Sequence, residues 1–171
     1  MAEPQGLSAG HAIGRVEVSF ERLPLRYPNN EKYNAETLMV HPVSGDVYVV
    51  TKADLGQKSS AYKVSAPLNT TNNDLVKLRT LSIPDGLDQI TAGSIDACGT
   101  TMLIRSYGVM YQFTVSESAP FDSIFSNGYT KVPAPAFPLV EKQGEAVTFG
   151  PLGGYYTVSE GTPALHFFGC R

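Results

Sequence analysis

Two segments of the chain place charged side chains at matching positions. Glu36 precedes Lys52 by sixteen positions, and Glu145 precedes Glu160 by fifteen. Carboxylates held close together repel one another, so they need a cation, shared protons or a neighbouring basic side chain. A hard cation such as Ca²⁺, bound through oxygen ligands, is a natural partner for such a group. Glu36 and Glu145 are therefore predicted to hold Ca²⁺ or another divalent cation, or else to bond neighbouring backbone and basic side chains.

The segments around these residues share one plan of short extended runs joined by turns. Two runs come first, then a third run with aromatic residues, and in two cases a fourth. The first and second runs are 34–42 and 46–52, 92–97 and 102–108, and 143–151 and 155–161. The third runs are 61–64, 109–113 and 164–168, and the fourth runs are 76–81 and 129–132. No stretch has a sustained apolar period of 3.6 residues, so little helix is expected.

The spacing of this repeat indicates a β-propeller. The positions predicted to be equivalent, Glu36, Gly93 and Glu145, lie 57 and 52 residues apart. Four short strands in roughly 40–50 residues make one propeller blade. The 16 Gly, 12 Pro, 9 Tyr and 8 Phe residues suit short strands, many turns and aromatic packing. We therefore predict an all-β fold with three four-stranded blades over residues 14–171, preceded by a flexible tail over residues 1–13.

The two ends of the chain predict how the propeller closes. Residues 14–20 alternate as a strand does, and the third segment reaches Arg171 without a fourth run. Three blades do not close a ring, because known propellers have at least about four. The prediction is a homodimer of half-propellers that forms a six-bladed ring, in which each N-terminal strand completes the partner's third blade. The alternatives are a second, different half-propeller chain, or a longer protein of which this chain is one half.

Three strings of the sequence resemble a known family: NAETLMVHPVSGDVYVVTK, RSYGVMYQF and QGEAVTFGPLGGYYTVSEG. They are similar to the C-terminal half of secreted six-bladed propellers that occur widely in bacteria and are mostly uncharacterised. The similarity extends over most of residues 27–168. It implies the propeller fold, a second similar half that is normally on the same chain, and no established activity. This sequence lacks that other half, where the more acidic motifs of the family lie.

In a propeller blade, the start of the first strand and the end of the antiparallel second strand emerge on one face. The expected geometry therefore gathers charged and aromatic side chains around one mouth of the central channel. The predicted ligand-binding residues at this mouth are Glu36, Lys52, Arg105, Tyr107, Glu145 and Glu160. No catalytic residue is assigned, because residues 6–10 match G-x-S-x-G without the strand and helix that a nucleophile needs.

Two functions are predicted as alternatives for the residues at this channel mouth. The first is a binding or scaffold module that holds a small or extended ligand, such as a small molecule or a glycan. The absence of Trp weakens carbohydrate stacking, although Tyr can substitute for it. The second is a metal-assisted hydrolase, lactonase-like or esterase-like, with Glu36 and Glu145 as metal ligands or bases. Propellers host both classes, so the fold does not choose between them.

Charge and hydropathy exclude other classes of function. Thirteen basic and sixteen acidic residues give a net charge of −3. Nucleic-acid binding needs a concentrated basic surface, so it is disfavoured. No run approaches the roughly 20 apolar residues of a membrane span, and no signal peptide is visible at the N-terminus.

The two cysteines bear on the cellular compartment. Cys98 lies in the first turn of the middle segment, and Cys170 follows the last aromatic run. Both are expected on the face opposite the charged mouth, in adjacent blades, where either a disulfide or two buried thiols would fit. Low charge, a cystine and the N-x-T sequon at 69–71 together favour an extracellular or secreted protein.

Overall fold

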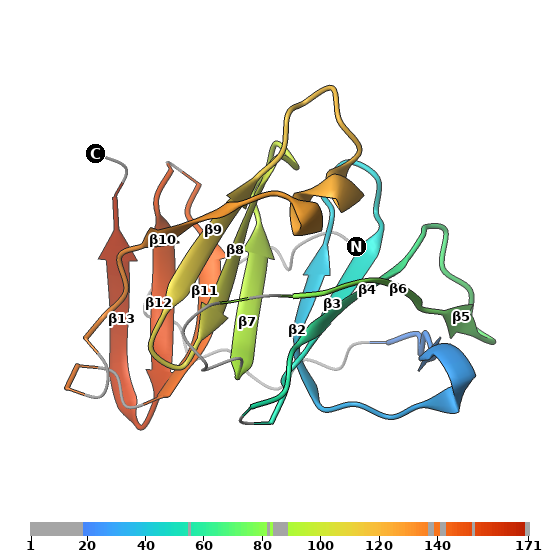
Figure 1. Cartoon of the computed structure of the whole chain (residues 1–171), viewed down its shortest axis with the longest axis horizontal. Coiled ribbons are helices and arrows are strands. Elements are labelled where there is room, and N and C mark those ends of the chain that lie inside the picture. Colours follow the sequence, from blue (N-terminus) through green and yellow to red (C-terminus); the bar gives the residue numbers. More distant parts are fainter. Residues whose placement is uncertain are drawn as a thin grey trace.

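The computed structural model describes residues 19–54, 56–81, 83, 89–136, 139–140, 143–151 and 153–169. It is built from strands and two short 3₁₀ helices (Figure 1). The strands are β1 (Leu25–Arg26), β2 (Ala35–Val40), β3 (Val47–Thr51), β4 (Ser60–Val64), β5 (Asn73–Asp74), β6 (Val76–Thr80), β7 (Ile90–Ile95), β8 (Thr101–Ser106), β9 (Met110–Thr114), β10 (Tyr129–Val132), β11 (Gln143–Phe149), β12 (Tyr155–Glu160) and β13 (Thr162–Phe168). The helices are η1 (Pro28–Asn30) and η2 (Phe121–Ser126). The predicted all-β class is confirmed.

The strands form three antiparallel sheets and one short parallel pair. Sheet 1 has the order β2-β3-β4-β6, sheet 2 the order β7-β8-β9-β10, and sheet 3 the order β11-β12-β13. The parallel pair joins β1 to β5. Every run predicted from the repeat is a strand of one of the three antiparallel sheets. Sheet 3 differs from the other two, since it has no fourth strand among the described residues.

The three sheets stand in a row and meet through their first strands. β7 lies between β2 and β11 and contacts both, as Figure 1 also shows. This arrangement places the starts of β2, β7 and β11 near one another. Side chains on these three strands can therefore form one site, although they come from distant parts of the sequence.

Apolar side chains of alternating strands fill the space between neighbouring sheets. Sheets 1 and 2 enclose a core that includes Met39, Tyr48, Val50, Met102, Ile104, Tyr111 and Phe113. Sheets 2 and 3 enclose a smaller core that includes Ala92, Leu103, Met110, Val147 and Tyr155. Sheet 2 has both faces covered, which is why the run from Met102 to Ile104 is continuously apolar rather than alternating.

Within the described residues, the two end sheets have outward faces that no other sheet covers. The outer face of sheet 1 is covered in part by β1, β5 and their flanking residues, which pack on Val47, Val49 and Tyr62. Its first strand stays open, with Leu38 and Val40 exposed. Sheet 3 exposes Val158, Leu165 and Phe167. The row therefore ends in apolar surface on both sides.

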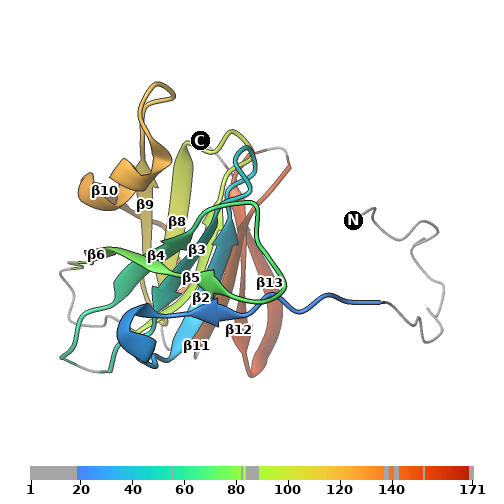
Figure 2. The same ribbon diagram turned by 90° about the vertical axis from the view of Figure 1, so that its right-hand side faces the viewer.

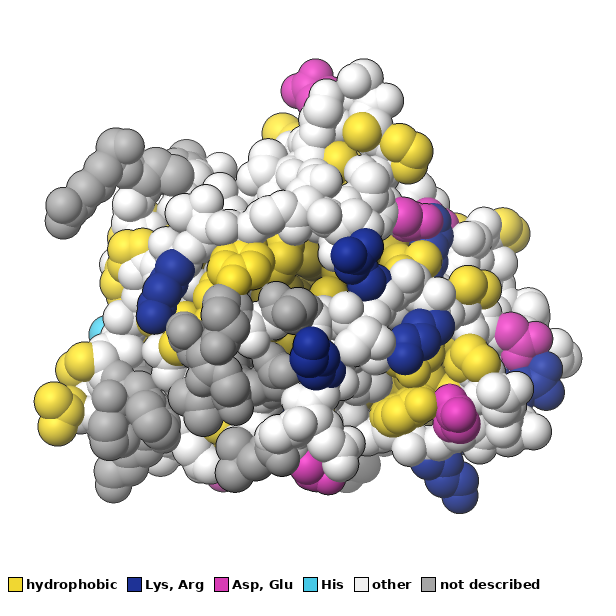
Figure 3. Space-filling model, in the orientation of Figure 1, with side chains coloured by type: hydrophobic (Ala, Val, Ile, Leu, Met, Phe, Trp, Pro, Cys, Tyr) yellow, Lys and Arg dark blue, Asp and Glu magenta, His cyan; other side chains and the backbone are white. Residues whose placement is uncertain are grey.

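Several sequence-based predictions lie outside the described residues. They are the flexible tail over 1–13, the G-x-S-x-G match at 6–10, most of the strand over 14–20, and Cys170. Within the described part of the chain, no helix has the length and apolar character needed to cross a membrane. On the face drawn in Figure 3, the described Lys and Arg side chains are spread over the surface rather than gathered in one patch, and some of them lie beside Asp or Glu side chains.

Candidate functional site

A β-bulge at the same place in each sheet positions the candidate site. Regular pairing of the first two strands is interrupted at Glu36 in β2, at Thr91 in β7 and at Glu145 in β11. A bulge leaves one residue out of the ladder, re-aims its side chain and is common beside functional sites. Thr91, rather than Gly93, is thus the counterpart of Glu36 and Glu145, which corrects the predicted repeat. The spacing becomes 55 residues from Glu36 to Thr91 and 54 from Thr91 to Glu145.

Gly93 has a packing role instead. It pairs with Ile104 on the side of sheet 2 that faces sheet 1. A Cβ at this position would lie 2.8 Å from both the Met39 sulfur and the Thr37 methyl group. The glycine therefore allows β7 and β2 to approach closely. This approach brings the bulges of sheets 1 and 2 to the same edge of the molecule.

The Lys52 ammonium joins the first two sheets at this edge. It donates to both carboxylate oxygens of Glu36, at 2.9 Å each, and to the hydroxyl of Tyr107 at 2.5 Å. It also lies 4.6 Å from the centre of the Tyr107 ring, within the range of a cation–π contact. Burial by itself would lower the pKa of Lys52, but the hydrogen bonds to Tyr107 and Glu36 raise it above its ordinary value. The ammonium is therefore charged at neutral pH.

Glu145 lies in the electrostatic field of the same group. Partial burial raises the pKa of its carboxyl, and so do the negative charges of Glu36 and Glu160. The positive charges of Lys52 and Arg105 act in the opposite direction, but they do not cancel the increase. None of the described residues forms an ion pair with Glu145 or donates a hydrogen bond to its carboxylate. This carboxylate therefore has acceptor positions open to a partner from outside the described chain.

Arg105 lies beneath this edge rather than on it. Its side chain is only 1% exposed, and its guanidinium donates from Nη1 to the backbone oxygen of Ala146 at 3.3 Å. A Cβ at Gly144 would overlap the guanidinium. Thr91 adds a second link, because its hydroxyl donates to the Gly144 oxygen at 2.5 Å. Sheet 2 thus holds the β11 bulge in place from below.

The structure brings the predicted mouth residues together. Lys52, Glu36 and Tyr107 are directly bonded, while Glu145, Glu160 and Arg105 interact with them through their charges. Arg105, which was predicted as a ligand-binding residue, is buried and supports the β11 bulge from sheet 2. Thr91 was missed, although an even spacing of 55 and 54 residues from the two glutamates marks its position. The group holds three carboxylates and two basic side chains, so it can accept hydrogen bonds from a small polar or cationic ligand.

The predicted divalent-cation site stays a prediction. Among the described residues, no three His, Cys, Asp or Glu side chains come together as metal ligands. Both oxygens of Glu36 already accept hydrogen bonds from Lys52. A cation bound between Glu36 and Glu145 would have to displace this ammonium or share the carboxylate with it.

Comparison with known proteins adds no family assignment. No protein-family model matches the chain, and no curated protein sequence matches it. The resemblance to secreted six-bladed propellers therefore rests on the sequence strings alone.

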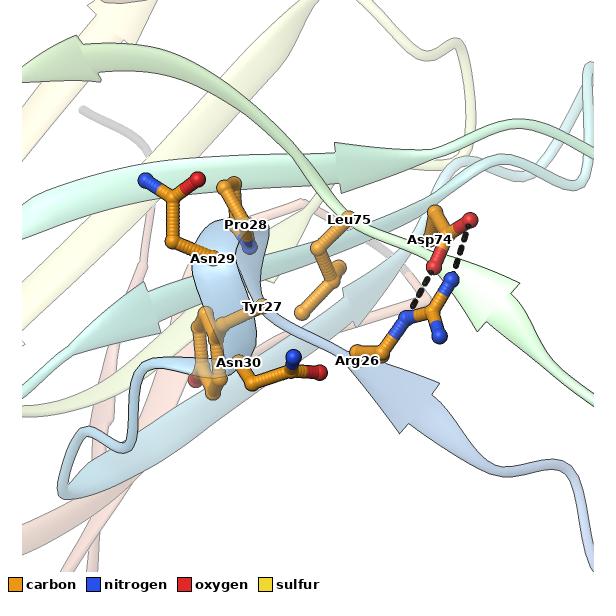
Figure 4. A pocket seen from close by; sticks show the side chains of 7 residues that line it. All are labelled: Arg26, Tyr27, Pro28, Asn29, Asn30, Asp74 and Leu75. Carbon is orange, nitrogen blue, oxygen red and sulfur yellow. Dashed lines mark hydrogen bonds and ion pairs between the residues drawn. The ribbon is translucent and has the colours of Figure 1, made fainter.

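A polar pocket of about 370 Å³, separate from the candidate site, lies where β1 pairs with β5 (Figure 4). The Arg26 guanidinium donates two hydrogen bonds to the Asp74 carboxylate there, of 2.7 and 3.0 Å. Asn29 and Asn30 both adopt left-handed backbone conformations, with φ of 56° and 55°. This corner fastens the segment before β2 against the outer face of sheet 1. We assign it a structural role, because its charged groups are paired with each other.

At the opposite ends of the strands, a second charged group has the Lys63 ammonium 2.9 Å from Asp46 and 3.1 Å from Asp122. His41 accepts a hydrogen bond from the backbone N–H of Ser44 at 3.1 Å and lies 3.1 Å from the Gly99 oxygen, which links the turns of sheets 1 and 2. His41 therefore has a structural role in joining these two turns. Cys98 is exposed in the same region, which differs from the buried thiol considered above. Its pairing with Cys170 stays a prediction, since Cys170 lies outside the described residues.

Proposed function

We propose that the chain is half of a six-bladed β-propeller and acts as a binding module for a small polar ligand. The ligand would occupy the edge at which the bulges of β2 and β11 present Glu36 and Glu145. The observation that carries this proposal is the asymmetry between the two carboxylates. Lys52 binds Glu36, whereas Glu145 has no hydrogen-bond donor among the described residues and an increased pKa.

The chemistry of Glu145 indicates the class of ligand. A carboxylate that is partly buried beside other carboxylates gains most from a partner that donates hydrogen bonds or carries positive charge. Small amines and polyhydroxylated compounds, including sugars, have such groups. The hydroxyl and ring of Tyr107 lie beside Lys52 at the same edge and offer a further surface for a sugar or an ammonium.

The repeat supports the propeller half of the proposal. In each antiparallel sheet, the first two strands pair in the same way and the first strand carries a bulge at the same place. The first strands of neighbouring sheets contact each other. Continued through six sheets, this relation closes a ring. A second copy of the chain, bringing three more sheets, would cover the open apolar faces of sheets 1 and 3.

The metal-assisted hydrolase is the other candidate from the sequence. It requires Glu36 to leave Lys52 in order to bind a metal or act as a base. Since both of its oxygens accept hydrogen bonds from that ammonium, the binding module is the better fit to the structure.

The test is calorimetric titration of the full chain with a panel of small amines, monosaccharides and divalent cations. We expect an amine or a sugar to bind, and Glu145→Gln to weaken its binding at least tenfold. Glu117→Gln is the matched control, because Glu117 is an exposed glutamate elsewhere on the surface. Stoichiometric binding of Ca²⁺ or another divalent ion that both Glu36→Gln and Glu145→Gln abolish would replace this proposal with the metal site. Equal affinities of Glu145→Gln and Glu117→Gln for the amine or sugar would overturn the proposal.

A further inference from the structure

An apolar groove of about 620 Å³ lies between sheet 2 and sheet 3, beside β13. It is far from the charged residues of the candidate site, none of which lines it. Its walls come from the middle of β9, the ends of β10, β11 and β13, and the start of β12. The apolar residues that line it are Val132, Pro133, Phe149, Tyr155, Phe167 and Phe168.

The groove lies where sheet 3 is one strand short. In sheet 1 the third strand, β4, pairs with β6, and in sheet 2 the third strand, β9, pairs with β10. The third strand of sheet 3, β13, pairs with β12 on one side and with no described strand on the other. An unpaired edge presents a row of N–H and C=O groups that readily accepts another strand. Apolar groove and open edge together have the properties of a strand-binding site.

The chain contains one further segment with the pattern of a strand. Residues 14–20 alternate, with Val16, Val18 and Phe20 on one side and Arg15, Glu17 and Ser19 on the other. The Phe20 side chain is 87% exposed, so nothing in the described chain covers it. One side of this segment would fill an apolar groove while the other side faced water.

We infer that residues 14–20 of a second copy of this chain occupy the groove and pair with β13 as the fourth strand of sheet 3. This inference rests on the half-propeller assembly of the proposed function and specifies its contact. Main-chain hydrogen bonds along β13 hold the strand, and its apolar side lies against Phe149 and Phe167.

The position of β1 selects a second copy rather than the same chain. β1 follows residues 19–24 and pairs with β5 beside sheet 1, at the opposite end of the row from β13 (Figure 1). In the side view, the residues just before β1 run away from the sheets (Figure 2). A ring made of two copies places sheet 1 of one copy next to sheet 3 of the other. The N-terminal segment of one copy therefore leaves sheet 1 of that copy next to the open edge of β13 in the partner copy.

The first experiment measures self-association of the full chain by analytical ultracentrifugation. We expect a dimer, and we expect Phe20→Asp to raise its dissociation constant at least tenfold. Because Phe20 is exposed, this change leaves the fold of the single chain intact, which circular dichroism checks. Leu139→Asp is the matched control, since Leu139 is 89% exposed and does not line the groove. A dimer that Phe20→Asp does not weaken would overturn the inference.

The second experiment locates the contact. Hydrogen exchange should show the amides of β13 protected in the dimer and exposed in the Phe20→Asp variant. A synthetic peptide of residues 12–22 should compete with dimer formation, whereas the same peptide with Asp at 16, 18 and 20 should not. A monomer whose β13 amides are already protected would overturn the inference, because the edge would then be filled from within the chain. Loss of ligand binding in Glu145→Gln is a separate measurement, so failure of the contact and failure of the ligand site can be told apart.

Discussion

The guanidinium of Arg105 fills the space that a side chain at Gly144 would need. Arg105 comes from the second strand of sheet 2, and Gly144 lies directly before the bulged Glu145 in the first strand of sheet 3. The position of the Glu145 carboxylate therefore depends on a buried residue of the neighbouring sheet. Glu145, the ligand-binding residue of the proposed function, is thus held by packing against a buried side chain of sheet 2.

The first prediction follows from this contact. Gly144→Ala places a methyl group against the guanidinium, and the backbone on that side is fixed by the bond from Thr91 to the Gly144 oxygen. Overpacking of this kind costs about 1–3 kcal/mol. We expect urea denaturation to show a loss of stability of that size, together with weaker ligand binding. Gly128→Ala is the control, because a Cβ at Gly128 meets nothing within 4 Å. Equal stability of the two variants would contradict the role assigned to Arg105.

A second prediction concerns the ion pair between Lys52 and Glu36. Lys52→Met removes the ammonium and leaves Glu36 beside Glu145 without compensation. Because the side chains are 13% and 34% exposed, the pair is only partly screened by solvent, and we expect a loss of about 1 kcal/mol in thermal or chemical unfolding. In a double-mutant cycle, Glu36→Gln should recover part of this loss. Lys77→Met, at an exposed lysine of β6, should cost almost nothing.

Much of the strand layout could be predicted because it depends on local pattern. A repeated order of short extended runs and turns, such as the Ser44-Gly45 turn after β2, suffices to define β2 and its neighbours. The sequence also predicted that Lys52, Glu36 and Tyr107 lie together. This prediction requires only that the start of each first strand lies beside the end of the second strand with which it pairs. These features depend on strand period and direction, which one sequence shows.

The bulges and the burial of Arg105 could not be predicted in the same way. A bulge adds one residue to a strand and shifts the alternation after it, so the repeat aligned Gly93 with the glutamates instead of Thr91. Arginine is rarely buried, so a sequence gives no reason to place Arg105 in an interior. The parallel pairing of β1 with β5 was also missed, because two-residue strands carry no pattern and form only through contacts between distant segments.

A third prediction concerns the link between sheet 1 and η2. The buried Tyr48 donates its hydroxyl to Asp122 at 2.6 Å, and Lys63 bonds the same carboxylate at 3.1 Å. Tyr48→Phe leaves the ring in place and removes the donor, so we expect a loss of about 1–2 kcal/mol in chemical denaturation. Tyr156→Phe is the control, because the Tyr156 hydroxyl has no partner among the described residues. A loss equal to that of the control would show that the Asp122 contact does not stabilise the fold.

The last prediction is the pH dependence that Glu145 confers. Burial and the charges of Glu36 and Glu160 raise the pKa of Glu145 in the folded chain above its ordinary value of 4.5, which applies to the unfolded chain. Between these two values the folded state binds more protons, so the stability contributed by this group is complete below 4.5 and falls as the pH rises through the folded pKa. Glu145→Gln removes this loss. We expect its Tm to exceed that of the unchanged chain by about 1–2 °C at pH 7, a small gain because the carboxyl is only partly buried.

The pH profile distinguishes this effect from a change in packing. The Tm difference between Glu145→Gln and the unchanged chain should shrink as the pH falls from 7 toward 4, where both side chains are uncharged. Glu117→Gln should show no such trend, since Glu117 is exposed and lies away from the candidate site. Scanning calorimetry at several pH values measures both differences. A constant gap across this range would mean that Glu145 is not repelled by Glu36 and Glu160, and the reason for expecting a donor ligand at its carboxylate would be lost.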